Sequence, residues 1–262
     1  MNYGLYLSAS GVLTNLYRQD VFANNLANVK TVGFKPDMSM VRQRDPESVE
    51  SDAGFELSQP LLDRLGGGVF AGPQHIDFRR GNFEKTRGDL DVALDAPDTF
   101  FAVSVSNPQT NQLEVQLTRD GRFVVDHKGY LVTAVEGHRV LDPGDQPIHL
   151  DPNAAAKIAP SSAVVQNEVE VARIQVATVV DTDRLLKQGG TRFRLDGPDS
   201  LRRVVERPKL HAGFVEASGA DPIKALMNVI AATKRVTGNG NLIRYHDLLM
   251  DRAVNVLGRV SA

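Results

Sequence analysis

The sequence predicts an α+β protein in which an antiparallel β-rich central domain is inserted between N- and C-terminal helices that pair as a coiled coil. Two patterns support this class. Apolar residues recur at helical spacing at both ends of the chain, whereas they alternate with polar residues in the middle. We expect a helix in 1–35, a linker or extended segment in 36–78, a β-rich domain in 79–205, a return segment in 206–220 and a helix in 221–262.

The composition is that of a folded chain without a strong charge imbalance. Of its 262 residues, 42% are hydrophobic and 24% are charged, which allows one or two domains with a sizeable core. The net charge of −2 gives no attraction to nucleic acid or to an anionic membrane. Cysteine is absent, which excludes disulfides, thiol catalysis and cysteine-based metal sites. The first residues lack a basic segment followed by a long apolar run, so we expect no cleavable signal peptide and no transmembrane helix.

Residues 3–28 form the first helical candidate, because no proline occurs before Pro36 and the apolar residues fall on one face. Small residues on this face would let a partner helix approach closely. The C-terminal helix is the expected partner, in an antiparallel pair that buries both apolar stripes. The residues of the N-terminal stripe are Leu5, Ala9, Val12, Leu16, Ala23 and Leu26.

The end of this helix is marked by three asparagines, Asn24, Asn25 and Asn28, whose amides compete for backbone groups in a helix interior. Gly33 then permits a turn, and Phe34 offers an apolar anchor after it. We expect the asparagines to satisfy polar groups at the helix end, either within their own subunit or against a neighbour's helix. The composition does not decide between these two arrangements.

The chain between the helices changes character twice. Residues 36–78 are of mixed quality, with an acidic, polar stretch and a glycine cluster that are typical of a linker or extended loop. The triple glycine at 66–68 lacks the spacing of a phosphate-binding loop. From 79 to about 205, short alternating runs separated by Gly, Asp and Pro predict an antiparallel sheet or barrel.

The C-terminal helix is predicted from Pro222 to Gly258, a stretch that would be about 55 Å long as an α-helix. Asp221 suits the N-cap and Pro222 the first helical position. Apolar residues recur every seven positions, which is the mark of a helix that packs along another helix. A long surface helix lying on its own domain is the alternative. The repeat comprises Val229, Val236, Ile243, Met250 and Leu257, flanked by Leu242, Leu249 and Val256.

Recognisable catalytic and metal-binding motifs are missing from the sequence. No two of the six histidines stand at metal-ligand spacing, and neither H-E-x-x-H nor G-x-S-x-G occurs. We therefore expect no cofactor, no metal and no small-molecule substrate. An active site assembled from distant residues stays open, and with it the alternative of a β-domain enzyme or ligand-binding protein that carries oligomerisation helices.

Three stretches together resemble the flagellar basal-body rod and hook family, most closely its rod proteins. The first, 23–35, contains Asn-Asn-Leu-Ala-Asn followed by Gly-Phe-Lys. The second, within 90–132, is similar to the start of the family's β-domain, and the third, 213–222, precedes the last helix. The sequence departs from the family pattern at Gly238 and Gly240, which stand where the last helix usually carries an aromatic residue and alanines.

The resemblance implies a structural subunit that the flagellar type III apparatus exports and that polymerises into the rod across the periplasm. It implies terminal helices in the inner tube and the β-domain in the outer layer. The partners would be further copies of the chain, other rod and hook subunits, and the export apparatus. The residues expected at assembly interfaces are Leu5, Val12, Leu16, Asn24, Asn25, Leu26, Asn28, Val229, Val236, Leu242, Ile243, Leu249, Met250, Val256 and Leu257.

Overall fold

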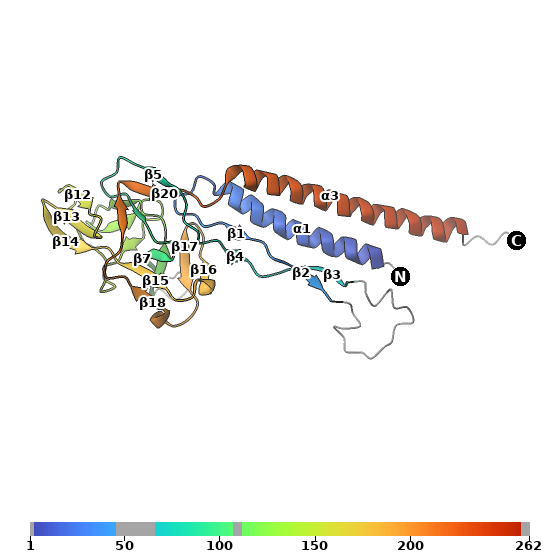
Figure 1. Ribbon diagram of the computed structural model, residues 1–262, viewed down its shortest axis with the longest axis horizontal. Coiled ribbons are helices and arrows are strands. Elements are labelled where there is room, and N and C mark those ends of the chain that lie inside the picture. Colours follow the sequence, from blue (N-terminus) through green and yellow to red (C-terminus); the bar gives the residue numbers. More distant parts are fainter. Residues whose placement is uncertain (1–2, 46–65, 107–111, 258–262) are drawn as a thin grey trace. The chain divides into compact units, whose positions relative to one another are not determined.

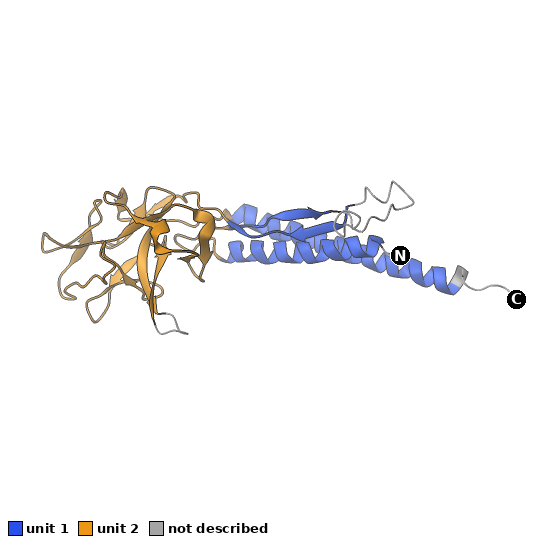
Figure 2. Ribbon diagram, turned by 90° about the horizontal axis from the view of Figure 1, so that it is seen from below, with its two compact units in different colours: residues 1–27, 37–75, 222–262 blue, residues 28–36, 76–221 orange. Residues whose placement is uncertain are grey.

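The computed structural model describes residues 3–45, 66–106 and 112–257. The expected order of an N-terminal helix, an antiparallel β-rich region and a C-terminal helix is confirmed (Figure 1). The chain divides into two compact units, which Figure 2 draws in separate colours. The helical unit comprises 1–27, 37–75 and 222–262, and the β-unit comprises 28–36 and 76–221.

Two long helices dominate the helical unit. Helix α1 (Tyr3–Ala27) has 25 residues, and helix α3 (Pro222–Arg252) has 31 residues and continues into a π-helical turn, η3 (Ala253–Leu257). The helices lie side by side and run antiparallel (Figures 1 and 2). Proline opens α3 at the position where its missing N–H is not needed, and no proline interrupts either helix.

Small and polar residues line the contact between these helices, which differs from the large apolar seam expected from the seven-residue repeat. Ala225 and Ala232 are the buried positions of α3, whereas Val229, Val236 and Ile243 are half-buried. Small side chains let two helix backbones approach closely, so the larger residues flank the contact. The buried residues of α1 are Ser8, Gly11, Thr14, Val21 and Asn25.

Short strands of the helical unit lie along α1. Strand β2 (Val41–Arg44) pairs antiparallel with β3 (Gly68–Ala71), and β1 (Asp37–Met38) pairs with β4 (His75–Ile76). The Thr14 hydroxyl donates to the carbonyl of Val69 at 3.2 Å, which joins α1 to β3.

The last residue of the triple glycine has a packing role at this contact. A Cβ on Gly68 would lie 2.6 Å from the hydroxyl oxygen of Ser10, and the φ of Gly68 is +106°. Only glycine combines that backbone conformation with so close an approach.

The β-unit is built on a large antiparallel sheet with β7 (Thr99–Ser106) near its centre. Its strand order is β16-β17-β8-β7-β11-β10-β9, and β15 also pairs with β7 and with β18. The remaining strands of this sheet are β8 (Leu113–Thr118), β9 (Phe123–Val125), β10 (Leu131–Thr133), β11 (Arg139–Val140), β15 (Val176–Val179), β16 (Leu185–Lys187), β17 (Arg192–Leu195) and β18 (Arg202–Val204).

Smaller antiparallel sheets complete the β-unit, in the orders β12-β13-β14, β19-β6 and β20-β5. Strands β14 and β15 are separated by Ile174 and Gln175, and 3₁₀ turns η1 (Thr182–Arg184) and η2 (Asp199–Leu201) follow β15. The strands of the smaller sheets are β5 (Phe83–Lys85), β6 (Val92–Leu94), β12 (Ala156–Ile158), β13 (Ala163–Gln166), β14 (Val169–Arg173), β19 (Leu210–Ala212) and β20 (Phe214–Glu216).

Adjacent phenylalanines of β7 serve two different cores, because successive side chains of a strand point to opposite faces. Phe101 packs in a cluster with Leu131 and Ile174, and Phe100 packs in a second cluster with Phe193. Both phenylalanine side chains are fully buried. The centre of the sheet is therefore packed on both faces.

Replacing either Phe100 or Phe101 by alanine should lower the free energy of unfolding of the β-unit by about 3–5 kcal/mol, because each change removes a fully buried ring and leaves a cavity. Chemical denaturation of the full chain measures the effect. Val171→Ala, at an exposed position of β14, is the control and should change stability by no more than about 0.5 kcal/mol. Equal effects at the three positions would contradict this account of the cores.

Candidate assembly surface

The chain segments that follow α1 and precede α3 are bonded to each other within the β-unit. The Gly33 N–H donates to the carbonyl of Glu216 at 2.7 Å, and the Gly219 N–H donates to the carbonyl of Phe34 at 2.9 Å. Gly33 has φ +70°, and a Cβ there would lie 2.5 Å from the backbone of Arg119. Glycine is therefore required at this turn.

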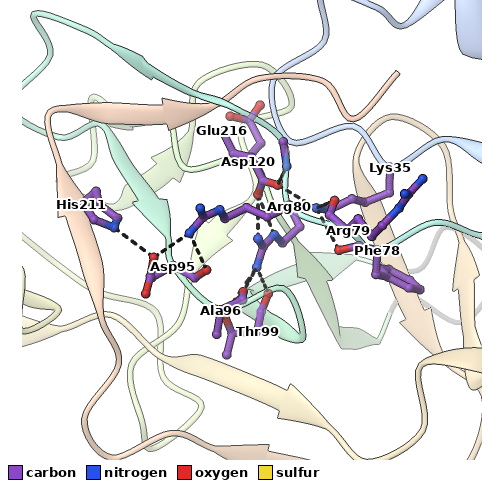
Figure 3. Close-up of polar contacts among 12 residues, drawn as sticks. Lys35, Phe78, Arg79, Arg80, Asp95, Ala96, Thr99, Asp120, His211 and Glu216 are labelled. Atoms are coloured by element: carbon purple, nitrogen blue, oxygen red, sulfur yellow. Dashed lines mark hydrogen bonds and ion pairs between the residues drawn. The ribbon is translucent and has the colours of Figure 1, made fainter. Parts of the chain in front are cut away.

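Glu216 is the centre of a buried ion cluster in the same place (Figure 3). Its Oε1 accepts from Nζ of Lys35 at 2.7 Å and from the Gly81 N–H at 2.7 Å. Its Oε2 accepts from Nε of Arg119 at 2.8 Å. The three charged side chains are each at most 1% exposed, so they are almost completely removed from water. We call Lys35, Arg119 and Glu216 the anchoring cluster.

Backbone carbonyls balance the two cations that share this one carboxylate. Lys35 Nζ donates to the carbonyls of Phe78 at 3.3 Å and Arg79 at 2.9 Å, and Arg119 Nη1 donates to the carbonyl of Ala96 at 2.7 Å. Burial lowers the pKa of both Lys35 and Arg119, while the charge of Glu216 acts in the opposite direction. Nζ of Lys35 has three acceptors, whereas Nη2 of Arg119 contacts Oε2 of Glu216 at 2.8 Å as an ion pair without a hydrogen bond. Contacts of this kind are what allow charged groups to remain in the interior.

Phe34 fills the apolar position beside this cluster, as the sequence predicts for an anchor. Its side chain is 3% exposed, and the Lys187 ammonium lies 4.4 Å from the centre of its ring. The same ammonium donates to the carbonyl of Lys35 at 2.5 Å. The Gly-Phe-Lys sequence therefore supplies a turn, an apolar anchor and a buried cation in consecutive residues.

The helical unit, in contrast, exposes large apolar side chains on both of its helices. On α1, Leu13 is 68% exposed, and on α3 the exposed side chains occupy both the first turns and the last turns. Isolated exposed apolar residues are common on proteins, but rows of them along a helix indicate a contact surface. These residues are Tyr3, Tyr6, Leu13 and Leu16 on α1, and Ile223, Leu226, Met227, Ile230, Leu242, Tyr245, Leu248, Leu249 and Met250 on α3.

Known proteins match this chain in the terminal motif and along the whole sequence. Residues 5–35 match the family described as "Flagella basal body rod protein". The flagellar basal-body rod protein FlgF of Caulobacter vibrioides is 28% identical over 262 residues, with 100% of each chain covered. FlgF of Mesorhizobium japonicum is 26% identical, again over 100% of both chains. FlgG of Bacillus subtilis is 25% identical over 96% of this chain and 98% of its own.

The chain is similar to flagellar basal-body rod proteins over nearly its whole length. The family match covers most of α1 together with Gly33, Phe34 and Lys35, which the structure places at the anchoring cluster. Sequence reasoning had identified Gly33 as a turn and Phe34 as an anchor but had missed Glu216 as the partner of Lys35. The Gly-Phe-Val-Glu sequence before α3 was the available signal, because a glutamate there follows two apolar strand residues.

Asn25 and Asn28 form hydrogen bonds within their own chain. Asn25 is buried and forms a pair of hydrogen bonds with the backbone of Asp37, at 2.7 Å to its carbonyl and 2.9 Å from its N–H. Asn28 accepts from the hydroxyl of Thr31 at 3.0 Å. Asn24 is exposed. Asn25 therefore fixes the chain that turns back along the end of α1.

The other residues expected at assembly interfaces divide by exposure. On α1, Leu5, Val12 and Leu26 are half-buried and Leu16 is 41% exposed. The side chains of Val256 and Leu257 lie outside the described part of the chain. On α3, the half-buried members are Val229, Val236 and Ile243, and the exposed members are Leu242, Leu249 and Met250.

The β-unit offers little space for a ligand at the polar hollow beside Thr118, Asp120 and Arg192. That hollow encloses about 50 Å³, against about 300–1,000 Å³ for ordinary small-molecule sites. In residues 3–45, 66–106 and 112–257, no three His, Asp or Glu side chains are grouped so that they could hold a metal ion. Within the same described residues, no helix has the length and apolar character needed to cross a membrane.

Replacing Glu216 by glutamine should lower the free energy of unfolding of the β-unit by about 3–5 kcal/mol, because Lys35 and Arg119 would remain buried without a counter-charge. Denaturant titration of the full chain measures the change. The control is Asp95→Asn, which removes a carboxylate paired with Arg80 at 2.8 Å but 38% exposed. An exposed pair of this kind is worth at most about 1 kcal/mol. Comparable losses of unfolding free energy in the two variants would show that the buried cluster contributes no more to stability than an exposed ion pair.

Proposed function

We propose that this chain is a structural subunit of the bacterial flagellar basal-body rod, which polymerises through its terminal helices into a tubular shaft in the periplasm. The main observation that supports this proposal is the exposed apolar surface of α1 and α3. Rod proteins of the flagellar basal body match the chain over its whole length, which supports the same role here. The role is structural, without catalysis and without a cofactor.

The distribution of the exposed side chains supports contacts with other helices rather than with a flat domain surface. The apolar rows of α3 lie near its start, around Ile223 and Ile230, and near its end, around Leu242 and Leu249. Each row recurs at three-, four- or seven-residue spacing, so it forms a stripe on one side of the helix. A stripe of this form is complementary to a stripe on a neighbouring helix.

Among the described residues, the end of α3 has few partners. His246 of α3 lies next to Gly4, close to the start of α1. The turns of α3 that come after His246 therefore extend past the first described residues of α1. Leu248, Leu249 and Met250 are there 46–61% exposed. Copies stacked head to tail would bring other helices to these turns, and head-to-tail contacts that do not close into a ring produce a helical assembly.

The partners in this proposal are further copies of the chain, other rod and hook subunits, and the export apparatus that delivers the subunit. The pairing of α1 and α3 as a coiled coil belongs to the assembled state in the same proposal. Leu16, Leu242, Leu249 and Met250 face outward and serve contacts between subunits. Half-buried Leu5, Val12, Val229, Val236 and Ile243 serve both the α1–α3 contact and its neighbours in the assembly.

Leu242→Asp should abolish rod assembly while leaving the β-unit folded. Leu242 is 49% exposed in the single chain, so the change costs the isolated subunit little, whereas an unpaired charge in a packed interface costs several kcal/mol. The measurement is rod completion by electron microscopy, with motility, in a deletion strain complemented by the variant. Export and folding of the subunit are checked separately.

The matched control is Asn241→Asp, which adds the same charge one residue away without removing an apolar side chain. We expect it to assemble. Normal rods from Leu242→Asp would contradict the proposed surface. Loss of rods from Asn241→Asp as well would mean that added charge on α3, and not the loss of the Leu242 contact, is responsible.

A further inference from the structure

The contact between α1 and α3 contains two positions where a polar side chain of α3 lies directly on a glycine of α1. A methyl group placed on Gly11 would lie 2.5 Å from Nδ2 of Asn239. A methyl group placed on Gly4 would lie 2.6 Å from both Cε1 and Nε2 of His246. Neither position leaves room for a Cβ atom while the polar side chain stays in place.

Both contacts belong to one antiparallel register. Gly4 and Gly11 are seven residues apart, as are Asn239 and His246, and the two residue numbers of each contact add up to 250. The same register brings Arg18 to the level of Ala232, which is 2% exposed. The pKa of Arg18 is lowered by burial and by the nearby charge of Arg235, which agrees with its place against α3.

We propose that these two glycine–polar contacts determine which helix α1 pairs with and in which register: α3 of the same chain. Slipping α3 by one heptad in one direction would place the Asn239 amide at the level of the long Arg18 side chain. Slipping it in the other direction would carry His246 beyond the first residue of α1. Only the observed register gives a glycine to each of the two polar side chains.

A means of fixing the partner of α1 is needed because the exposed apolar rows also allow pairing with helices of other copies. Apolar contacts are non-directional, so the outward stripes of α1 and α3 in other copies compete with the correct partner. A polar side chain in a helix contact costs stability but excludes other registers and partners, because it fits at one place only. Asn239 and His246 therefore mark the inner face of α3, while its apolar outer face stays available for contacts between subunits.

Glycine-to-alanine changes separate this proposal from simple helix propensity. Alanine favours a helix over glycine by about 1 kcal/mol, so Gly238→Ala and Gly240→Ala, where nothing lies within 4 Å of the added Cβ, should slow amide exchange in α3 about fivefold. Gly11→Ala should do the opposite and speed exchange in α1 about fivefold. Adding Asn239→Ala should restore the protection of α1, because it frees the space that the new methyl group needs.

Hydrogen exchange on the purified full chain measures all four variants. Slower exchange in α1 of Gly11→Ala, as in the two control variants, would overturn the proposal. It would also be overturned if the Asn239→Ala change failed to restore protection, or if α1 of the unaltered chain showed none. None of these measurements requires assembly. The register proposal can therefore be wrong while the rod assignment is right, and the rod assignment can be wrong while the register proposal is right.

Cysteine pairs test the register directly, because the chain contains no cysteine of its own. Arg18→Cys with Ala232→Cys is the matched pair, and Arg18→Cys with Ala225→Cys reports a slip of one heptad. That slip moves one helix by about 10 Å, beyond the reach of a disulfide. In the unaltered background, we expect the matched pair to be the one that oxidises within one chain. Adding Gly11→Leu should raise disulfide formation in the slipped pair at least fivefold. Equal oxidation of both pairs in the unaltered background would contradict the proposal.

Discussion

The carboxylate of Glu216 is the constraint on which the arrangement of the connecting segments depends. It binds Lys35, which follows α1, and Arg119, which follows β8, and it lies on β20, the last strand before α3. A buried carboxylate with two buried cations is costly unless all three groups keep their partners. The requirement therefore fixes together three parts of the chain that are far apart in the sequence, and it explains why a lysine can stand in the interior directly after Phe34.

The elements themselves could be predicted well from local patterns. The first helix was expected at 3–28 and spans Tyr3–Ala27, and the stretch 79–205, expected to be rich in strands, contains β5 to β18. These cases succeed because period and turn residues are local properties of the sequence. Between β14 and β15, Ile174 and Gln175 are buried but belong to neither strand, and local alternation does not reveal such a break.

The contacts between distant residues could not be predicted in the same way. Lys35 and Glu216 are separated by 181 positions. The Gly-Phe-Val-Glu sequence places a glutamate after two apolar strand residues, but it does not identify Lys35 as the partner of that glutamate. The seven-residue apolar repeat correctly indicated a helix that packs along another helix, but it did not identify the inner face. Ala225 and Ala232 form that face because close approach of two backbones favours small side chains, a preference that a search for large apolar residues overlooks.

The antiparallel contact of α1 with α3 also determines when the subunit can be completed. Gly4 meets His246, so the two halves of this contact are separated by nearly the whole chain. Closing so large a loop carries an entropic cost and delays the contact relative to local strand pairing. The strands of the β-unit can pair as soon as they are synthesised. Helix α1, in contrast, cannot pack against α3 until α3 has been synthesised. Any chain that ends early is therefore left with an unmatched first helix, however well its middle is folded.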